Sequence, residues 1–274
     1  MMIWLNGELV EQHRAEVSAL DHGLTVGDGV FETVKTVQGE PFALTRHLDR
    51  LTRSATGLGL PAPDLEQVRK GCEAVTAANP MPLGRLRITY TGGIGPLGSD
   101  RLDSPPTLVI ALGAATPRPE TTAVATVEWT RNERAATAGL KTTSYAENVI
   151  ALAHAHRQGA SEALFPNTLG RLCEGTGSNV FVVLDGKLLT PPLSAGCLAG
   201  VTRALVLDWC DGEEADLPMD VLQRAEEVFL TSTLRDVQAV SRVDQRVLDD
   251  APGPVTARAM AAFTARSAAD PDPR

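Results

Sequence analysis

The chain has 274 residues, of which 43% are hydrophobic and 22% charged, values typical of a globular protein that buries a core. Its formal charge of -9 at pH 7 argues against a surface for nucleic acid or an anionic membrane, because both need clustered cations. The sequence shows no transmembrane run and no signal-peptide pattern, so we expect a cytoplasmic protein that binds a small molecule.

The pattern of the first 112 residues predicts a mixture of strands and helices. Residues 3–10 (IWLNGELV) indicate two short strands around an Asn-Gly turn. A glycine-rich turn at 21–29 (DHGLTVGDG) precedes an alternating strand at 30–37 (VFETVKTV). Further along, the pattern predicts helices at 46–60 and 64–79 and strands at 85–93 and 106–112.

Residues 113–122 are rich in proline and threonine, and we interpret them as the linker between two domains, 1–112 and 123–268. Residues 167–178 (NTLGRLCEGTGS) are rich in turn formers, and 269–274 are expected to be a disordered tail. The second part is predicted to contain strands at 123–129, 162–165, 179–184, 187–190, 226–232 and within 233–245, and helices at 147–159, 200–210 and 254–267. This irregular alternation indicates a mixed α/β protein.

The cysteines offer no metal site, because their spacing contains no Cys-x-x-Cys or Cys-x-x-His pair. We expect Cys72, Cys173, Cys197 and Cys210 to be free thiols, and we expect no metal.

The chain contains only four lysines, and one of them stands in an unusual context. Lys35, Lys70 and Lys187 fall on a strand, a helix and a hairpin turn, where solvated surface positions explain them. Lys141 follows Ala-Gly-Leu and precedes two threonines and a serine. A primary amine forms a Schiff base with an aldehyde and a guanidinium does not, so Lys141 is the candidate for covalent chemistry.

Two further groups complete a candidate constellation. Glu174 stands before Gly-Thr-Gly-Ser-Asn and a strongly apolar strand, where it either caps a loop or faces a protonated ring nitrogen. The stretch AGVTR places Val201 and Thr202 at a helix start, where free N–H groups bind anions. Arg50 adds either a cation for the same anion or a solvated helix-face charge, and Thr233 adds a hydroxyl at a strand end.

An amine for an aldehyde, a carboxylate for a pyridinium and a cradle for phosphate are together the requirements of pyridoxal 5′-phosphate. The motifs that carry them also resemble a family. From residue 4 to about 243, the stretches DHGLTVGDGVFET, RHLDRL, GLKTTSYAENV, EALF, CEGTGSNVF, LLTPPLSAGCLAGVTR and EVFLTSTLRDVQAV resemble the fold type IV pyridoxal-phosphate enzymes, the class IV aminotransferases.

The resemblance implies a smaller N-terminal α/β domain, a larger C-terminal α/β domain that binds the cofactor, and a homodimer. It implies that Lys141 is the Schiff-base lysine and proton shuttle and that Glu174 pairs with the ring nitrogen. The residues implied to hold the phosphate are Arg50, Val201, Thr202 and Thr233. Tyr145 is implied to lie at the phenolic oxygen of the cofactor.

The same core residues serve a transaminase and a lyase, so the motifs leave that choice open. The stretch TGGIGPLGSDR lacks the Arg-x-His pair of D-amino acid transaminases, and the enterobacterial lyase pattern is missing as well. The style of TVGDGVFETVK and LKTTSYAENV favours 4-amino-4-deoxychorismate lyase, with an amino acid transaminase, D-selective or branched-chain, as the alternative. A binding protein without cofactor is the remote third. The candidates for binding substrate carboxylates are Arg85, Arg87, Arg101 and Arg235.

Overall fold

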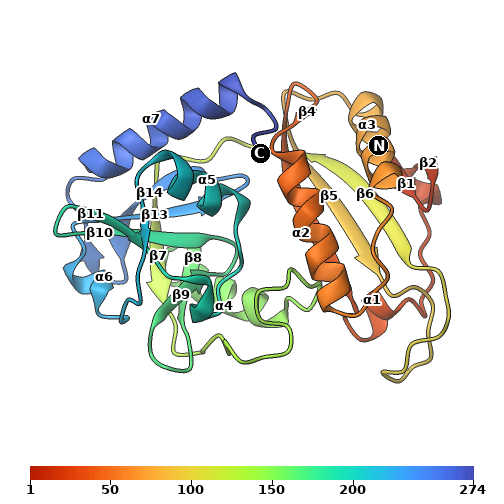
Figure 1. Cartoon of the computed structure of the whole chain (residues 1–274), viewed down its shortest axis with the longest axis horizontal. Helices are drawn as coiled ribbons and strands as arrows, with labels where there is room; N and C mark the ends of the chain where they lie inside the picture. Colours follow the sequence, from red (N-terminus) through yellow and green to blue (C-terminus); the bar gives the residue numbers. More distant parts are fainter. The chain divides into compact units, whose positions relative to one another are not determined.

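The computed structural model describes all residues, 1–274, and the chain forms two compact units (Figure 1). Unit 1 contains Met1–Pro117, Leu140–Ser144 and Asp270–Arg274, and unit 2 contains Arg118–Gly139 and Tyr145–Ala269. The mixed α/β organisation in two parts is as predicted. The first division falls inside the predicted linker, but unit 1 also receives two later segments of the chain, one of which carries Lys141.

Unit 1 is built on a six-stranded sheet. Its order is β2 (Glu8–Glu11), β1 (Met2–Leu5), β6 (Thr107–Ala114), β5 (Leu83–Thr91), β3 (Gly29–Val37) and β4 (Glu40–Pro41). All neighbouring strands run antiparallel. The longest pairing joins β3 and β5, from Gly29 opposite Thr91 to Val37 opposite Leu83. This register decides which side chains share a face of the sheet.

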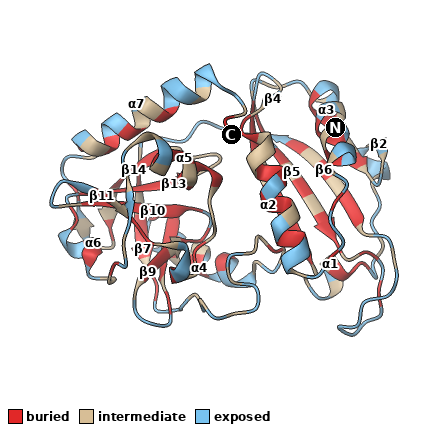
Figure 2. Cartoon of the chain, viewed as in Figure 1, coloured by how far each residue is buried: buried red, intermediate tan, exposed pale blue.

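Two amphipathic helices supply the apolar core of unit 1. In α2 (Leu44–Gly57) the buried Leu48, Leu51 and Ala55 recur at helical spacing, and in α3 (Leu65–Ala78) buried apolar residues recur in the same way. They pack on the inward side chains of β3, β5 and β6, so the core lies between helices and sheet (Figure 2). Short elements η1 (Gln12–Arg14) and α1 (His22–Thr25) complete the unit.

Unit 2 is built on a nine-stranded sheet that mixes parallel and antiparallel pairs. Its order is β12 (Glu213–Glu214), β11 (Lys187–Thr190), β10 (Asn179–Leu184), β13 (Glu227–Ser232), β14 (Asp236–Val243), β7 (Thr121–Thr126), β8 (Glu162–Pro166) and β9 (Leu172–Gly175), with β15 (Arg246–Val247) beside β14. The central strands β10 and β13 are almost fully buried, and their paired Phe181 and Phe229 rings stack 4.8 Å apart. Continuous burial explains why the middle residues of both strands are apolar.

Helices cover the unit 2 sheet. They are α4 (Ala146–Arg157), η2 (Leu193–Ala195), α5 (Val201–Trp209), α6 (Val221–Arg224) and α7 (Pro254–Ala269). Helix α4 places Ala151 and Ala155 against Phe165 and its neighbours on β8, while α5 and α7 pack on β13 (Figure 1). No helix of the chain is both long enough and apolar enough to span a membrane.

Three local expectations were wrong. The turn-rich stretch 167–178 contains strand β9, and the glycine-rich turn at 21–29 contains the short helix α1. The tail expected to be disordered is attached to unit 1, where Asp272 accepts hydrogen bonds from the N–H and the hydroxyl of Thr45 at 2.8 and 2.6 Å. Its residues have little side-chain hydrophobicity, but they satisfy the open N–H groups at the start of α2.

Candidate functional site

Lys141 lies on a short segment that extends the unit 1 sheet. Its carbonyl accepts a hydrogen bond from Phe31 N–H at 3.0 Å, and Thr143 N–H donates to the Gly29 carbonyl at 2.8 Å. The Lys141 N–H donates to Ser54 Oγ at 3.1 Å. These bonds fix the backbone of the lysine against β3 and α2, and its Nζ lies 4.2 Å from the centre of the Phe31 ring.

A buried charge cluster lies in the same unit. Glu32 is fully buried on β3, and its two carboxylate oxygens accept hydrogen bonds from Nε and Nη2 of Arg50, each at 2.7 Å. His47 Nδ1 lies 2.7 Å from Glu32 Oε2. Arg50 is therefore a buried residue held in a two-pronged ion pair, and its interpretation as a solvated helix-face cation was wrong.

The cluster shifts the pKa values of its members. Burial would raise the pKa of Glu32, but the Arg50 charge and hydrogen bonds, with help from His47, hold that pKa well below its usual range. Burial lowers the pKa of His47; Glu32 opposes this, while the charges of Arg50 and Lys141 lower it further. His47 therefore stays neutral at neutral pH, and the Arg50 cation is balanced by the Glu32 carboxylate.

Glu174 lies on β9 in unit 2, so it is a strand residue. Its Oε2 accepts a hydrogen bond from Leu198 N–H at 2.9 Å, and its Oε1 lies 3.3 Å from Nε of Arg131. The cation of Arg131 also lies 4.1 Å from the centre of the Phe165 ring, and its Nη2 donates to Asn148 Oδ1 at 2.9 Å. The carboxylate is thus oriented by one backbone donor and one fixed cation.

The start of α5 has the properties of an anion site. Gly200 is the N-cap residue and, having no side chain, caps none of the first N–H groups of the helix. A Cβ at Gly200 would overlap Asn179 Oδ1, which explains the glycine. Val201 and Thr202 are buried at the first turn, and Thr233 follows β13, the strand on which α5 packs.

These residues fit the cofactor that the resemblance implies. Leu198, which donates to Glu174, stands three residues before Val201, and three residues of chain span at most ~10 Å. The carboxylate for a ring nitrogen and the donors for a phosphate are therefore close enough in space to contact the two ends of one small phosphorylated ring. Glu174, Val201 and Thr202 lie together in unit 2, while Lys141 and Arg50 lie together in unit 1. Tyr145 is the N-cap residue of α4 and is half-buried.

The four candidate arginines separate into two kinds. Arg101 donates to Asp28 Oδ2 at 2.7 Å and to the carbonyls of Gly59 and Leu58, so it fastens a loop of unit 1. Arg235 donates to Glu162 Oε2 at 2.8 Å; burial lowers its pKa, and Glu162 opposes the shift. Arg85 and Arg87 both lie on strand β5. The guanidinium of Arg87 lies 3.3 Å from the centre of the Phe31 ring.

Sequence reasoning missed Glu32, His47 and Arg131. Glu32 could have been recognised from the sequence. It lies two residues from both Val30 and Val34, so strand alternation places it on the same, core-facing side of β3. Arg131 could not, because it stands in an irregular segment. Lys35 was interpreted as a solvated residue, but it is buried, with Nζ 5.3 Å from the centre of the Phe42 ring.

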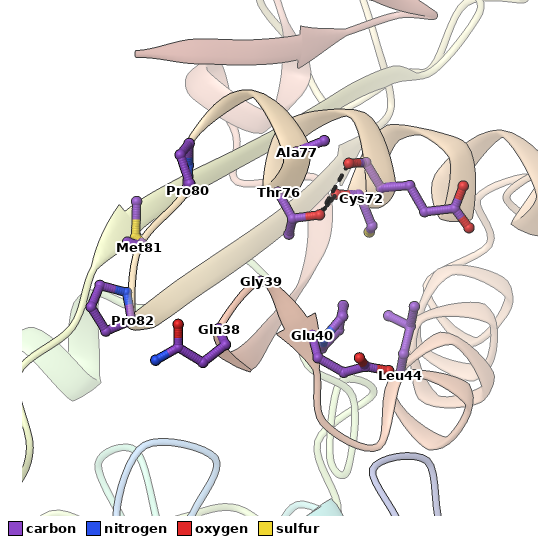
Figure 3. A pocket seen from close by; sticks show the side chains of 12 residues that line it. Gln38, Gly39, Glu40, Leu44, Cys72, Thr76, Ala77, Pro80, Met81 and Pro82 are labelled. Atoms are coloured by element: carbon purple, nitrogen blue, oxygen red, sulfur yellow. Dashed lines mark hydrogen bonds between the residues drawn. The ribbon is translucent and has the colours of Figure 1, made fainter.

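A cavity of about 810 Å³ also lies in unit 1, but none of the predicted site residues lines it. Its walls come from the β3–β4 turn with the start of α2 and from the end of α3 with the prolines that follow it (Figure 3). The Thr76 hydroxyl there donates to backbone carbonyls of its own helix, as Figure 3 shows. The cavity presents no group suited to a Schiff base or to phosphate.

Comparisons with known proteins agree with this chemistry. The family model for class IV amino-transferases matches residues 29–243. A Methanocaldococcus jannaschii protein, provisionally described as a branched-chain-amino-acid aminotransferase, is 33% identical over 91% of this chain and 90% of its own length. The D-alanine aminotransferase of Listeria monocytogenes is 31% identical over 94% of this chain and 93% of its own length.

Solved structures give the same picture. The branched-chain amino acid aminotransferase of Escherichia coli superposes with a TM-score of 0.90 at 26% identity, covering 96% of this chain and 93% of that one. A Legionella pneumophila protein, provisionally described as a 4-amino-4-deoxychorismate lyase, has a TM-score of 0.87 and covers 93% of this chain and 96% of that one. At 23% identity, that second likeness is one of fold alone.

Proposed function

Because this chain belongs to the class IV aminotransferases, enzymes that depend on pyridoxal 5′-phosphate, we propose that it is an amino acid transaminase. The observation that carries the proposal is the set of relatives matched over nearly their full length, which are described as D-alanine and branched-chain aminotransferases. The sequence style favoured a lyase, but the lyase likeness extends only to the fold. Transamination is therefore the better supported outcome.

We propose the following roles for the residues of this chain. Lys141 would hold the cofactor aldehyde through its Nζ amine and would carry the substrate proton. Glu174 accepts a hydrogen bond from the ring nitrogen, held in place by Arg131 and the Leu198 amide. The phosphate is bound by Arg50, Val201, Thr202 and Thr233, and the phenolic oxygen is met by Tyr145.

When bound, the cofactor supplies the electron sink that makes removal of an α-proton feasible. The protein supplies the base and the orientation. Phe31 N–H donates to the Lys141 carbonyl and Lys141 N–H donates to Ser54 Oγ, and these bonds hold the start of the lysine side chain in place. The N–H groups at the start of α5, which no N-cap side chain occupies, would hold the phosphate.

A paired assay tests the function. The purified holoenzyme is incubated with 2-oxoglutarate and either D-alanine or L-leucine, and separately with 4-amino-4-deoxychorismate. We expect glutamate to form with an amino acid donor. Release of 4-aminobenzoate and pyruvate with no glutamate from any amino acid would replace the transaminase proposal with the lyase.

Borohydride reduction tests the lysine. We expect reduction to attach the cofactor permanently to Lys141, which peptide mapping by mass spectrometry would detect. We expect Lys141→Ala to abolish both labelling and turnover. Lys187→Ala removes an exposed lysine in a hairpin and serves as the matched control, with labelling unchanged. A label on any other lysine contradicts the assignment. The homodimer and the cytoplasmic location stay predictions.

A further inference from the structure

A buried ion pair in unit 2 joins two turns that lie next to proposed cofactor residues. Glu162 is the first residue of β8 and is 3% exposed, and its Oε2 accepts a hydrogen bond from Arg235 Nη2 at 2.8 Å. The side chain of Arg235 is itself 7% exposed. Both charges are therefore removed from water, and each is balanced by the other.

Arg235 belongs to the turn that contains Thr233. The connection between β13 and β14 consists of residues 233–235 only. From this turn the guanidinium of Arg235 reaches the start of β8, where it donates to the Ser161 carbonyl at 3.1 Å and to the Ser161 hydroxyl at 3.2 Å, as well as to Glu162. In so short a turn, the anchoring of Arg235 restricts where Thr233 can lie.

The other carboxylate oxygen of Glu162 holds the turn that follows Glu174. Glu162 Oε1 accepts a hydrogen bond from Gly177 N–H at 2.7 Å and another from the Thr176 hydroxyl. The Asn148 amide donates to the Thr176 carbonyl, so Thr176 is held from two directions. This turn begins directly after β9, and its bonds therefore fix the end of the strand that carries Glu174.

We propose that Glu162 and Arg235 are positioning residues for the cofactor, an inference that rests on the proposed function and on the roles assigned there to Glu174 and Thr233. The single carboxylate of Glu162 connects the segment that holds the ring-nitrogen partner to the turn that holds a phosphate ligand. The pair thereby keeps the two contacts at the separation that one cofactor molecule requires, and it acts through Glu174 and Thr233.

The energetics of buried charge support a role of this kind. Removing two charges from water is costly, so a buried ion pair contributes little stability compared with apolar side chains of the same volume. The bonds of this pair also extend to backbone groups of Ser161 and Gly177, so they fix segments of chain as well as side chains. The pair is therefore better suited to setting a geometry than to stabilising the fold.

The two residues should differ in what their loss disturbs. Loss of Arg235 should loosen the turn of Thr233 and leave Glu162 bonded to the turn after Glu174. Loss of the Glu162 charge should disturb both turns. Pyridoxal has the ring and the aldehyde of the cofactor but no phosphate, so its binding reports on the ring contacts alone.

The test measures dissociation constants of pyridoxal 5′-phosphate and of pyridoxal, from titration of the apoenzyme followed by visible absorption. We expect Arg235→Met to weaken pyridoxal 5′-phosphate about tenfold or more and pyridoxal less than about threefold. We expect Glu162→Gln to weaken both ligands. Arg246→Met is the matched control, because Arg246 also donates to backbone carbonyls of unit 2, those of Leu222 and Ala225. It should bind both ligands as wild type does.

A double variant shows whether the two residues act as one unit. Each single change already breaks the pair, so Glu162→Gln combined with Arg235→Met should lose less affinity for pyridoxal 5′-phosphate than the product of the two single losses. Losses that multiply would mean independent roles and would overturn the proposal. Unchanged pyridoxal 5′-phosphate binding in Arg235→Met, or equal weakening of the two ligands, overturns it as well.

Two further variants keep the outcome decisive. Arg235→Lys keeps the charge and loses the planar fork, so its affinity should fall between those of Arg235→Met and wild type; it carries the test if Arg235→Met does not fold. Weaker pyridoxal 5′-phosphate binding in Thr233→Val with normal binding in Arg235→Met would keep the phosphate role and reject the pair. If the affinities behave as expected but no amino acid is transaminated, the positioning residues stand and the proposed function fails.

Discussion

Arg131 and Glu174 show how a single side chain can be prepared for a cofactor. Glu174 is oriented by the Leu198 amide and by Arg131, and Arg131 is fixed in turn by Asn148 and the Phe165 ring. The Asn148 amide donates to the Thr176 carbonyl, so this chain of contacts ends on the backbone. Arg131 therefore acts as a positioning residue for the carboxylate that we assign to the ring nitrogen.

Arg131→Met should weaken cofactor binding about tenfold or more, because it removes the cation that orients the Glu174 carboxylate, and the proposed hydrogen bond between that carboxylate and the ring nitrogen contributes ~1.5–3 kcal/mol. The measurement is the dissociation constant of pyridoxal 5′-phosphate, from titration of the apoenzyme followed by visible absorption. Arg134→Met, with its side chain 81% exposed, is the matched control and should bind the cofactor normally. Equal affinities in the two variants would leave Arg131 with no role in orienting Glu174.

The environment of single side chains could be predicted from the sequence only in part. A charge between two core valines marks Glu32 as a buried, paired carboxylate, and that reasoning needs only strand alternation. The partners of Glu32 come from α2, and sequence alone does not orient a helix against a strand. Arg131 and Lys35 depend on tertiary packing, which explains why one was missed and the other was interpreted as solvated.

At the level of elements, the C-terminal segment completes α2, the helix that carries His47 and Arg50. The N-cap residue Ala43 has a left-handed backbone with φ of 53° and no side-chain cap, and its N–H donates to the Pro271 carbonyl at 2.7 Å. Asp272 bonds both donors of Thr45 in the first turn. A segment remote in sequence thus does what a local Ser or Asp does in most helices.

Asp272→Ala should lower the free energy of unfolding by about 1 kcal/mol, the usual cost of removing a helix cap. Urea unfolding followed by circular dichroism measures the change. Asp249→Ala removes an exposed carboxylate ahead of α7 and should alter stability by less than about 0.5 kcal/mol. If both variants unfold at the same urea concentration, the tail does not stabilise α2.

Elements with clear periodicity could be predicted, and those defined by distant partners could not. Strand β3 and helix α3 follow from alternation and from the Asp64 cap, whose side chain accepts from Glu66 and Gln67 N–H. Strand β9 was missed because its four residues, which lie between turn formers, have no strand pattern of their own. The strand is defined by its pairing with β8. The ordered tail was missed because its bonds reach across 227 positions of the chain.

For the whole molecule, the buried cluster makes stability depend on pH. The pKa of Glu32 is well below its ordinary 4.5 in the folded chain, so the unfolded chain binds more protons as pH falls through 4.5. The pKa of His47 is likewise lowered from 6.5, with the same sign. Stability should therefore fall as pH drops from about 6.5, and more steeply below 4.5.

Glu32→Gln should cost ~3–5 kcal/mol of stability at pH 7, because it leaves Arg50 buried without its counter-charge. Below pH 4.5 the gap from wild type should narrow, since the unfolded wild-type chain then binds a proton at Glu32 that the folded chain excludes. Urea unfolding between pH 7 and 3.5 tests this. Glu11→Gln, whose side chain is 62% exposed, is the control. Parallel curves for wild type and Glu32→Gln would refute the pH argument.

The division of the chain was only partly visible in the sequence. The proline-rich stretch marks where the chain first leaves unit 1, at Pro117. Nothing in residues 138–149 marks the return of Leu140–Ser144 to unit 1, because that return depends on hydrogen bonds to Phe31 and Gly29. The peptide that carries Lys141 is therefore hydrogen-bonded to β3 of unit 1, although its neighbours along the sequence belong to unit 2.

Because the chain crosses between the two units four times, neither unit can be produced as one continuous fragment. The polypeptide passes between the units after Pro117, Gly139, Ser144 and Ala269, so a protease nick at any one of these places leaves at least one fragment that carries residues of both units. Neither unit corresponds to one uninterrupted stretch of a gene. A truncation intended to isolate the first half would remove the segment Leu140–Ser144, which carries Lys141 and is hydrogen-bonded to β3, so a recombinant half-protein would lack part of unit 1.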